Sequence, residues 1–377
     1  MTFFDHFFAA DKSYFDVPVS DQENFLKKLG KASSDLDRSY KQYRSQLFFY
    51  SHKKRLILST SSFVLLIFLL PYYIIRGLFI KKGEKVDAIC RADENAQFIP
   101  DSLLGKYVID RTKWDTKGSI YWKDIPYIIS LCIRYFFNPY FTIKVLFKVS
   151  KYSSFIHSYN PRAIIVNDEF SFTSSAMTSF CERYGVLHIN VQHGEKLYII
   201  RDSYFRFHEC YVWDNHYRDL FISMNSEPSQ FVIELPESMK FDVKKHFSQD
   251  CYADYKYYLT KYDEKELLSI INAMSFAAKF GKSVKFRPHP NYSDIELLRK
   301  YVSEESIELP NVNIIESISS TQNVVGVHST VLTQAYFNNR NVIIDDVSCN
   351  QFYKSLSEMK YILMDKVKNR LSSCQLT

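Results

Sequence analysis

The feature that most constrains the fold is the alternation of short apolar runs with helical patterns from residue 86 onward. Helical periodicity over 174–183 and 217–224 separates the runs. Apolar strands joined by helices predict a parallel sheet covered on both faces, and therefore a Rossmann-like domain over 86–235. The runs of strand length in this domain are 86–90, 163–167, 187–192, 209–213 and 231–235.

A second α/β series follows a polar stretch at 236–261, which we interpret as a linker between domains. The chain has 377 residues, which suits two domains of roughly 100–200 residues each. We therefore expect an α/β fold with two facing Rossmann-like domains, the second over 262–377. Its predicted helices are 264–280, 295–302 and 330–338. Its predicted strands are 283–287, 312–316, 324–327 and 341–345, with 361–364 as a candidate for one more.

Residues 1–85 precede both domains, and we expect them to form a helical region. No charged residue occurs between 56 and 75, a length close to the roughly 20 residues that span a bilayer core. Basic residues flank this stretch on both sides, which suits a helix lying at the inner leaflet, with Tyr72 and Tyr73 at the interface. A spanning helix, interrupted at Pro71, and a buried core helix are the alternatives. We take 56–80 as a membrane-associating segment.

The apolar stretch 120–150 carries a few charges and predicts one or two amphipathic helices that cover a sheet or touch the membrane. The net charge of +6 is modest and argues against a nucleic-acid binder. Seven cysteines are scattered singly, which indicates a reducing, cytoplasmic compartment. The one Asp-x-Asp pattern, Asp35-Leu36-Asp37, has no strand before it, so we expect no metal site.

Glycine is scarce. The chain has 9 glycines, whereas average usage of about 7% would give roughly 26. Proteins that hold phosphate in several glycine-rich loops are therefore disfavoured, and no P-loop pattern is present. Any phosphate has to be held by other means.

Ligands of open parallel sheets bind beyond the carboxyl ends of the strands. Polar residues follow four predicted strands, two in each domain, and we expect all four groups to face a cleft between the domains. The groups are Asn167-Asp168-Glu169, Gln192-His193-Gly194-Glu195, Arg287-Pro288-His289-Pro290-Asn291 and His328-Ser329-Thr330.

Each group has a physical use. Gly194 predicts a tight turn that projects the imidazole of His193 from a strand end. The two prolines around His289 fix the backbone that carries it. Ser329-Thr330 opens a helix, where a hydroxyl cap, free N–H groups and the positive helix end form an anion site without a glycine loop.

On these motifs, residues 163–346 resemble bacterial GT-B-fold glycosyltransferases of surface polysaccharides. The group includes capsule and lipooligosaccharide sialyltransferases, Kdo transferases and teichoic-acid glycerophosphotransferases. The resemblance rests on Gln192-His193-Gly194, on His289-Pro290 and on Ser329-Thr330. It implies an N-terminal acceptor domain, a C-terminal domain that binds a nucleotide-sugar, and an acceptor that is a glycan or lipid-linked glycan at the cytoplasmic face of the inner membrane.

The resemblance also implies residue roles. His289, Ser329 and Thr330 would contact the donor phosphate, and Arg287 and His328 stand beside them. His193 is the first candidate for the base that deprotonates the acceptor hydroxyl, with Glu169 or Asp168 second, because the unperturbed pKa of histidine lies near the working pH. Negative charge on the leaving phosphate would be met by these fixed donors, so no cofactor or metal is expected.

The donor stays open, with a CMP-sugar preferred. Phe170 stands where the sialyltransferase motif has glycine, and His328 stands where the teichoic-acid enzymes more often have serine. Three other functions remain: transfer of a polyol phosphate from a CDP-alcohol, epimerisation of a sugar nucleotide, and a non-catalytic scaffold in a polysaccharide assembly complex.

Overall fold

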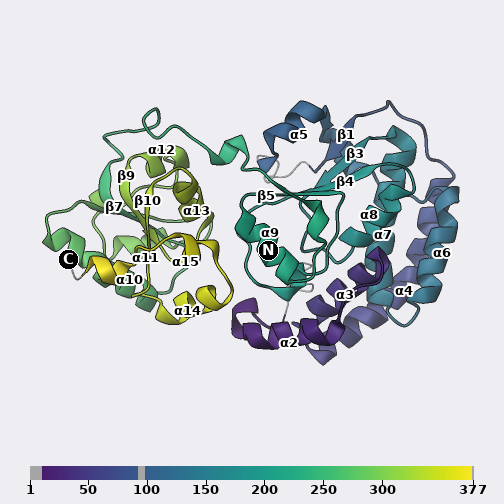
Figure 1. Ribbon diagram of the computed structural model, residues 1–377, viewed down its shortest axis with the longest axis horizontal. Coiled ribbons are helices and arrows are strands. Elements are labelled where there is room, and N and C mark those ends of the chain that lie inside the picture. Colours follow the sequence, from purple (N-terminus) through teal and green to yellow (C-terminus); the bar gives the residue numbers. More distant parts are fainter. Residues whose placement is uncertain (1–10, 92–97, 376–377) are drawn as a thin grey trace. The chain divides into compact units, whose positions relative to one another are not determined.

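Two parallel sheets organise the chain, one in each of two units (Figure 1). The computed structural model describes residues 11–91 and 98–375, so the start of the predicted N-terminal region lies outside the described residues. Unit 1 comprises Met1–His193 and Ile199–Pro236, and unit 2 comprises Gly194–Tyr198 and Glu237–Thr377. The predicted α/β class with two parallel sheets is confirmed.

The sheet of unit 1 has the order β2-β1-β3-β4-β5-β6, and all of its strands are parallel. Each predicted strand is present within about two residues, and the two-residue strand β2 is an addition. Val166 of β3 pairs with Asn190 of β4, so the carboxyl ends of these strands lie side by side. The strands are β1 (Ala88–Cys90), β2 (Ile109–Asp110), β3 (Ala163–Val166), β4 (Leu187–Val191), β5 (Glu209–Val212) and β6 (Phe231–Ile233).

Helices pack around this sheet, and the most buried of them is α7, whose apolar residues lie in the core on several sides. The stretch 120–150 therefore forms two helices, α6 and the start of α7, as the sequence predicts. The helices of unit 1 are α2 (Val19–Leu29), α3 (Asp35–Leu47), α4 (His52–Gly77), α5 (Asp101–Lys106), α6 (Ile125–Arg134), α7 (Pro139–Tyr159), α8 (Ser174–Glu182) and α9 (Asn215–Ser223).

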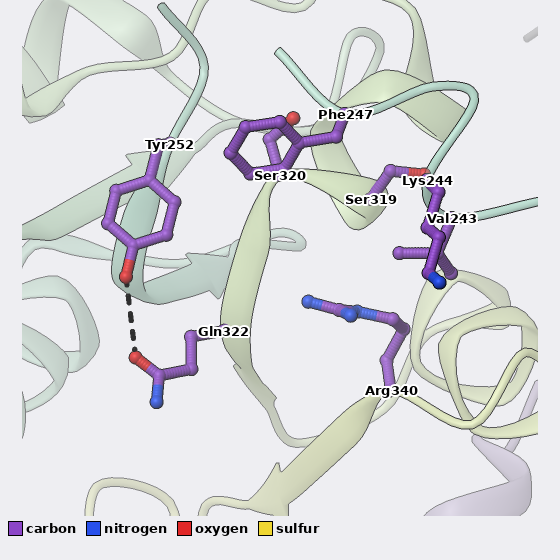
Figure 2. Close-up of a pocket in the computed structure, with 8 residues that line it drawn as sticks. All are labelled: Val243, Lys244, Phe247, Tyr252, Ser319, Ser320, Gln322 and Arg340. Atoms are coloured by element: carbon purple, nitrogen blue, oxygen red, sulfur yellow. Dashed lines mark hydrogen bonds between the residues drawn. The ribbon is translucent and has the colours of Figure 1, made fainter. Parts of the chain in front are cut away.

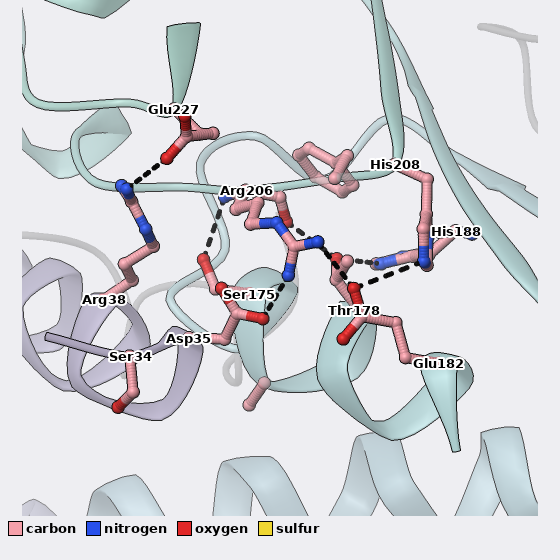
Figure 3. Close-up of polar contacts among 12 residues, drawn as sticks. Ser34, Asp35, Arg38, Ser175, Thr178, Glu182, His188, Arg206, His208 and Glu227 are labelled. Atoms are coloured by element: carbon pink, nitrogen blue, oxygen red, sulfur yellow. Dashed lines mark hydrogen bonds and ion pairs between the residues drawn. The ribbon is translucent and has the colours of Figure 1, made fainter. Parts of the chain in front are cut away.

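The N-terminal helices belong to unit 1, because α3 packs against α8 and α4 packs along α7. Figure 3 shows the polar contacts that attach α3. Arg206 donates to Asp35 at the start of α3 and, at 2.5 Å, to Glu182 at the end of α8. Arg38 donates to Glu227 at 2.5 Å. Asp35 is therefore part of an ion pair with Arg206.

Helix α4 continues through Pro71 without a break, which corrects the predicted interruption. Proline removes one backbone hydrogen bond, but the turns on either side hold the helix. In the described part of the chain, α4 alone has the length and composition of a bilayer-crossing helix, with only 11% of its most apolar window buried. The alternative of a buried core helix therefore does not describe it.

The sheet of unit 2 has the order β10-β9-β7-β8 and is also parallel. The sequence correctly predicts β8, β9 and β10 and the helices α10, α11 and α13. Its elements are β7 (Ala253–Tyr258), β8 (Val284–Arg287), β9 (Thr321–Gly326), β10 (Asn341–Ile344), α10 (Glu264–Lys279), α11 (Ile295–Arg299), α12 (Ile314–Ser319), α13 (Thr330–Phe337), α14 (Asn350–Glu358), α15 (Ile362–Lys366) and α16 (Leu371–Cys374).

Three predictions for unit 2 are wrong. Strand β7 lies inside the predicted linker 236–261, since its Lys256 reads as polar but is fully buried in an ion pair with Glu308. The predicted strand 312–316 overlaps helix α12, whose first turn is capped because the Asn313 side chain accepts from the N–H of Ile315 at 2.8 Å. The possible strand 361–364 overlaps helix α15.

Candidate functional site

The carboxyl ends of β3 and β4 place four predicted or neighbouring polar side chains together in unit 1. Asn190 connects the two strand ends: its Oδ1 accepts from the N–H of Asp168 at 2.8 Å, and its Nδ2 donates to Glu169 Oε2 at 3.1 Å. Asn190 is 1% exposed and lies inside β4, where nothing in the sequence marks it as a site residue. It fixes the loop that carries both carboxylates.

Glu169 and His193 form a buried carboxylate and a partly exposed imidazole in contact. His193 Nδ1 lies 3.6 Å from Glu169 Oε1, and the two side chains are 24% and 1% exposed. The distance is longer than a hydrogen bond, but such contacts often tighten when substrate binds. A carboxylate behind an imidazole orients the ring and stabilises its protonated form, so His193 is suited to accept a proton at Nε2.

Asp168 is held differently from Glu169. Its carboxylate is bonded to Lys148 of α7 and lies 3.9 Å from Arg91 Nη1. Burial raises the pKa of Asp168, but the charges of Lys148 and Arg91 outweigh burial and hold the pKa below its usual value. A carboxylate with a lowered pKa is a weak base, so the geometry favours His193 with Glu169 over Asp168.

Three lysines of α7 give this edge of the sheet a positive charge that the sequence analysis missed. Burial lowers the pKa of Lys144, and the nearby charge of Lys148 adds to that effect. Burial and Lys148 also lower the pKa of Lys151. The signal was present in the sequence, because positions 144, 148 and 151 share one face of a helix.

Two more members of the predicted Gln192–Glu195 group, Gln192 and Gly194, have structural roles. Gln192 is 1% exposed, and its Oε1 accepts from the N–H of Trp213 at 3.2 Å, so the side chain ties β4 to the end of β5. Gly194 has a φ of +67°, which confirms the predicted turn after His193. Glu195 follows in the segment Gly194–Tyr198, which belongs to unit 2.

In unit 2, the loop after β8 holds His289 as the sequence predicts. Its backbone N–H donates to Ser293 Oγ at 2.8 Å, and its Nδ1 accepts from the N–H of Asn291 at 3.1 Å. Burial lowers the pKa of His289, so the ring is neutral near pH 7. With Nδ1 accepting, the proton lies on Nε2, and this N–H is suited to donate to an anionic oxygen.

Arg287 differs from the prediction that it binds a phosphate. Its Nη1 donates to Glu308 Oε2 at 2.6 Å, and its Nη2 donates to the carbonyls of Val312 at 2.7 Å and Pro310 at 3.3 Å. The side chain is 7% exposed. Because these partners occupy the guanidinium, we revise the prediction: Arg287 holds the loop after β8 in place and is removed from the phosphate-binding set.

The N-terminus of α13 gathers the other predicted residues of unit 2. Ser329 is the N-cap, and its Oγ accepts from the N–H of Val331 at 3.2 Å, which leaves its O–H free to donate. Thr330 begins the helix. Burial lowers the pKa of His328 to about 4, so it is neutral at pH 7.

Three buried polar atoms lie near this helix end: His328 Nε2, Thr333 Oγ1 and Tyr361 OH. The Tyr361 hydroxyl interacts with the Thr333 side chain and the Ser329 backbone, whereas His328 Nε2 has no hydrogen-bond partner among residues 11–91 and 98–375. The rings of His328 and Tyr361 are 4.9 Å apart. Sequence reasoning missed Tyr361 and Thr333, because neither follows a strand directly. A buried polar atom without a partner is costly, so His328 Nε2 makes this end of α13 suited to receive a polar ligand.

The carboxyl edge of the sheet in unit 1 offers an acid–base pair. The carboxyl edge in unit 2 offers neutral hydrogen-bond donors and a helix N-terminus. In the described ranges no group of three or more His, Cys, Asp or Glu side chains could hold a metal ion. The donors of unit 2 can stabilise negative charge on a phosphate oxygen.

No protein-family model and no curated protein matches this chain. Among solved structures, UDP-N-acetylglucosamine 2-epimerase from Rickettsia bellii is 12% identical, with a TM-score of 0.40 over 69% of this chain and 78% of that chain. The wall teichoic acid polymerase TagF is 9% identical, with a TM-score of 0.36 over 60% and 64%. Anabaena HepE in complex with UDP is 10% identical, with a TM-score of 0.38 over 70% and 81%. Values this low leave the reaction to be argued from the side chains.

Proposed function

We propose that this chain is a metal-independent, inverting glycosyltransferase of the GT-B class that moves a sugar from a nucleotide-sugar donor to a cell-surface polysaccharide or lipooligosaccharide acceptor. The observation that carries the proposal is the contact between buried Glu169 and partly exposed His193 at a strand end. Such a pair serves a reaction in which a hydroxyl must lose its proton as it attacks.

In this mechanism His193 takes the proton of the acceptor hydroxyl at Nε2, and Glu169 stabilises the imidazolium. The hydroxyl attacks the anomeric carbon from the face opposite the phosphate, so the configuration inverts. The bond from the anomeric carbon to the phosphate oxygen breaks, and charge grows on that oxygen. His289 Nε2–H, the Ser329 and Thr330 hydroxyls and the α13 N-terminus are the donors that we assign to this charge.

Calorimetry with CMP, CDP, UDP and GDP is the first test, and CMP is our preferred nucleotide. Binding should weaken at least about tenfold in His289→Ala, since a hydrogen bond to a charged group is worth roughly 1.5–3 kcal/mol. Phe280→Ala changes an exposed ring elsewhere in unit 2 and serves as the control. If no nucleotide binds the wild-type chain, the scaffold alternative replaces the enzyme.

The reaction itself separates the remaining alternatives. Radiolabelled donor sugar should enter a glycan or lipid-linked glycan acceptor, and His193→Ala should lower kcat at unchanged nucleotide affinity. Glu169→Gln should lower kcat less, because it acts through His193. A phosphodiester product seen by phosphorus NMR would assign the CDP-alcohol transferase. Interconversion of UDP-GlcNAc and its 2-epimer without an acceptor would assign the epimerase.

We also propose that the protein lies on the cytoplasmic face of the inner membrane through an apolar surface on α4 and α6. On α4, Ile67 and Phe68 are 58% and 67% exposed, and after α6 Phe137 is 90% exposed. The rings of Phe63 and Phe136 are in contact at 6.2 Å, which joins the two helices into one surface. Exposed apolar surface of this extent marks an interaction site.

The packing of α4 favours a helix that lies in the membrane plane over one that spans it. One side of α4 packs along α7, which is a core helix of unit 1. A spanning α4 would have to leave α7 or carry it into the hydrocarbon. The basic residues at both ends of α4, including Lys53 and Lys82, suit the anionic headgroups.

Vesicle flotation tests this surface. The protein should float with phosphatidylglycerol-containing vesicles and less with pure phosphatidylcholine, and the double substitution Phe68→Asp with Phe137→Asp should abolish flotation. Phe280→Asp, at a 63% exposed phenylalanine of unit 2, should float like wild type. Equal flotation of the double variant would refute this surface, and resistance of wild type to carbonate extraction would favour a spanning helix.

A further inference from the structure

A cavity of about 430 Å³ lies in unit 2 at the amino ends of the strands (Figure 2). Tyr252 precedes β7, Ser320 precedes β9 and Arg340 precedes β10. The residues assigned to the donor phosphate follow the carboxyl ends. The six residues of β9 at about 3.3 Å each place roughly 17 Å between the two edges. The cavity is therefore separate from the site proposed above.

One wall of the cavity is the segment that leads into β7, and hydrogen bonds hold it in place. The N–H of Ser248 donates to Ser320 Oγ at 2.8 Å, and the N–H of Phe241 donates to Asn338 Oδ1 at 2.8 Å. The rings of Phe247 and Tyr252 face the cavity and lie 6.2 Å apart. The wall is therefore mainly apolar and aromatic, and it is fixed at both ends.

The cavity also carries positive charge. Figure 2 shows the Arg340 guanidinium directed among the lining residues, with Lys244 nearby. One guanidinium nitrogen donates to the carbonyl of Thr321, but the buried Nε has no hydrogen-bond partner among the described residues. The buried Oγ of Ser319 also has no partner within the described ranges. Both atoms can therefore donate a hydrogen bond to a ligand.

No carboxylate in the described part of the chain forms an ion pair with Arg340 or Lys244. Two carboxylates neighbour the lining residues: Asp242 accepts from the backbone N–H of Lys244 at 3.0 Å, and Asp254 accepts from the Tyr252 hydroxyl at 3.4 Å. Arg340 is partly buried, and this burial lowers its pKa. An uncompensated buried charge is destabilising, so an anion in the cavity would relieve that cost.

We infer that this cavity is a second ligand site that binds an organic phosphate monoester with a ring. Arg340, Lys244 and the Ser319 hydroxyl would hold the phosphate, since guanidinium and ammonium groups are the usual phosphate partners in proteins. Phe247 and Tyr252 would pack on the ring. A volume near 430 Å³ suits a ligand no larger than a mononucleotide.

Ligand-observed NMR and calorimetry with CMP, ribose 5-phosphate and inorganic phosphate test the site. A ring-bearing phosphate should bind more tightly than inorganic phosphate. Lys244→Gln and Arg340→Gln should each weaken this binding about tenfold or more, and Phe247→Ala should bring ribose 5-phosphate or CMP down to the affinity of inorganic phosphate. Lys244 and Phe247 are exposed, so their variants keep the fold.

The control is His289→Ala, which changes the other edge of the sheet. If CMP occupies two sites, His289→Ala should remove one and Arg340→Gln with Lys244→Gln the other, so failure of either proposal is seen separately. Unchanged affinities in Lys244→Gln and Phe247→Ala would overturn the second site. Loss of all phosphate binding in His289→Ala alone would also overturn it.

Discussion

Replacing Glu308 by glutamine should destabilise unit 2 strongly, because this carboxylate neutralises two buried cations. Its oxygens accept from Lys256 and, at 2.6 Å, from Arg287, and its side chain is 4% exposed. Burial opposes ionisation of Glu308, but Lys256 and the hydrogen bonds from Ser317 and Arg287 hold its pKa below the usual value. The charge is therefore present at neutral pH.

The magnitude follows from that arrangement. Glu308→Gln leaves Lys256 and Arg287 buried without a counter-charge, and breaking a buried pair in this way costs about 3–5 kcal/mol. Urea m-values of roughly 1–3 kcal/mol per molar convert this loss into a midpoint lower by about 1 M or more. A midpoint within about 0.3 M of wild type would refute the reasoning, since it would mean that the site is not desolvated.

Two spectroscopic signals can show which unit loses stability in Glu308→Gln. All three tryptophans, Trp114, Trp122 and Trp213, lie in unit 1. Tryptophan fluorescence therefore follows unit 1, and far-ultraviolet circular dichroism follows both units. Glu308→Gln should shift part of the dichroism transition and leave the fluorescence transition in place. Glu304→Gln, which removes a surface contact to Arg299, is the matched control and should shift neither.

Three further predictions concern groups whose burial decides their role. Arg287→Met should lower the stability of unit 2 and leave the nucleotide affinity of the folded protein unchanged in calorimetry; weaker binding at full stability would return Arg287 to the phosphate-binding set. Burial lowers the pKa of His188 from 6.5 to about 3, so the unfolded chain binds one more proton between these values and the free energy of unfolding should fall by about 1.4 kcal/mol per pH unit below 6.5. Below pH 6.5 the free energy of unfolding, from fluorescence-monitored urea titrations, should fall more steeply in wild type than in His188→Gln; equal slopes would contradict it. Gly194→Ala should destabilise by about 1–2 kcal/mol because φ is positive there, whereas Gly105→Ala, in a helix with open space around it, should not destabilise, as thermal melts would show.

The parallel sheets could be predicted because their central strands are apolar on both faces. Strand β7 could not, since Asp254 and Lys256 give it a polar sequence. Lys256 is buried only because Glu308, 52 residues away, meets its charge. Helix α12 was missed for a local reason. Its apolar start reads as a strand, and the Asn313 cap that begins the helix is one residue among several polar neighbours.

In the candidate site too, features set by local sequence could be predicted, and features set by distant contacts could not. The turn at Gly194 and the cap at Ser329 depend on local backbone chemistry, and the sequence predicts both. The contact of Glu169 with His193 follows from the adjacency of β3 and β4, which alternating strands and helices make probable but do not fix. Asn190 and Tyr361 were not predicted, because their roles depend on which buried atoms surround them.

Two arginines of unit 2 make the physical reason explicit. Arg287 stands at a strand end beside a Pro-flanked histidine, where a phosphate ligand is expected, yet Glu308 and two backbone carbonyls occupy its donors. Arg340 stands in an ordinary loop before β10, yet its Nε is buried without a partner among the described residues. The position of an arginine in the sequence indicates which edge of the sheet its guanidinium lies near. Whether that cation is available to a ligand depends on whether the fold already provides its counter-charge: Arg287 pairs with Glu308, and Arg340 has no ion-pair partner among the described residues.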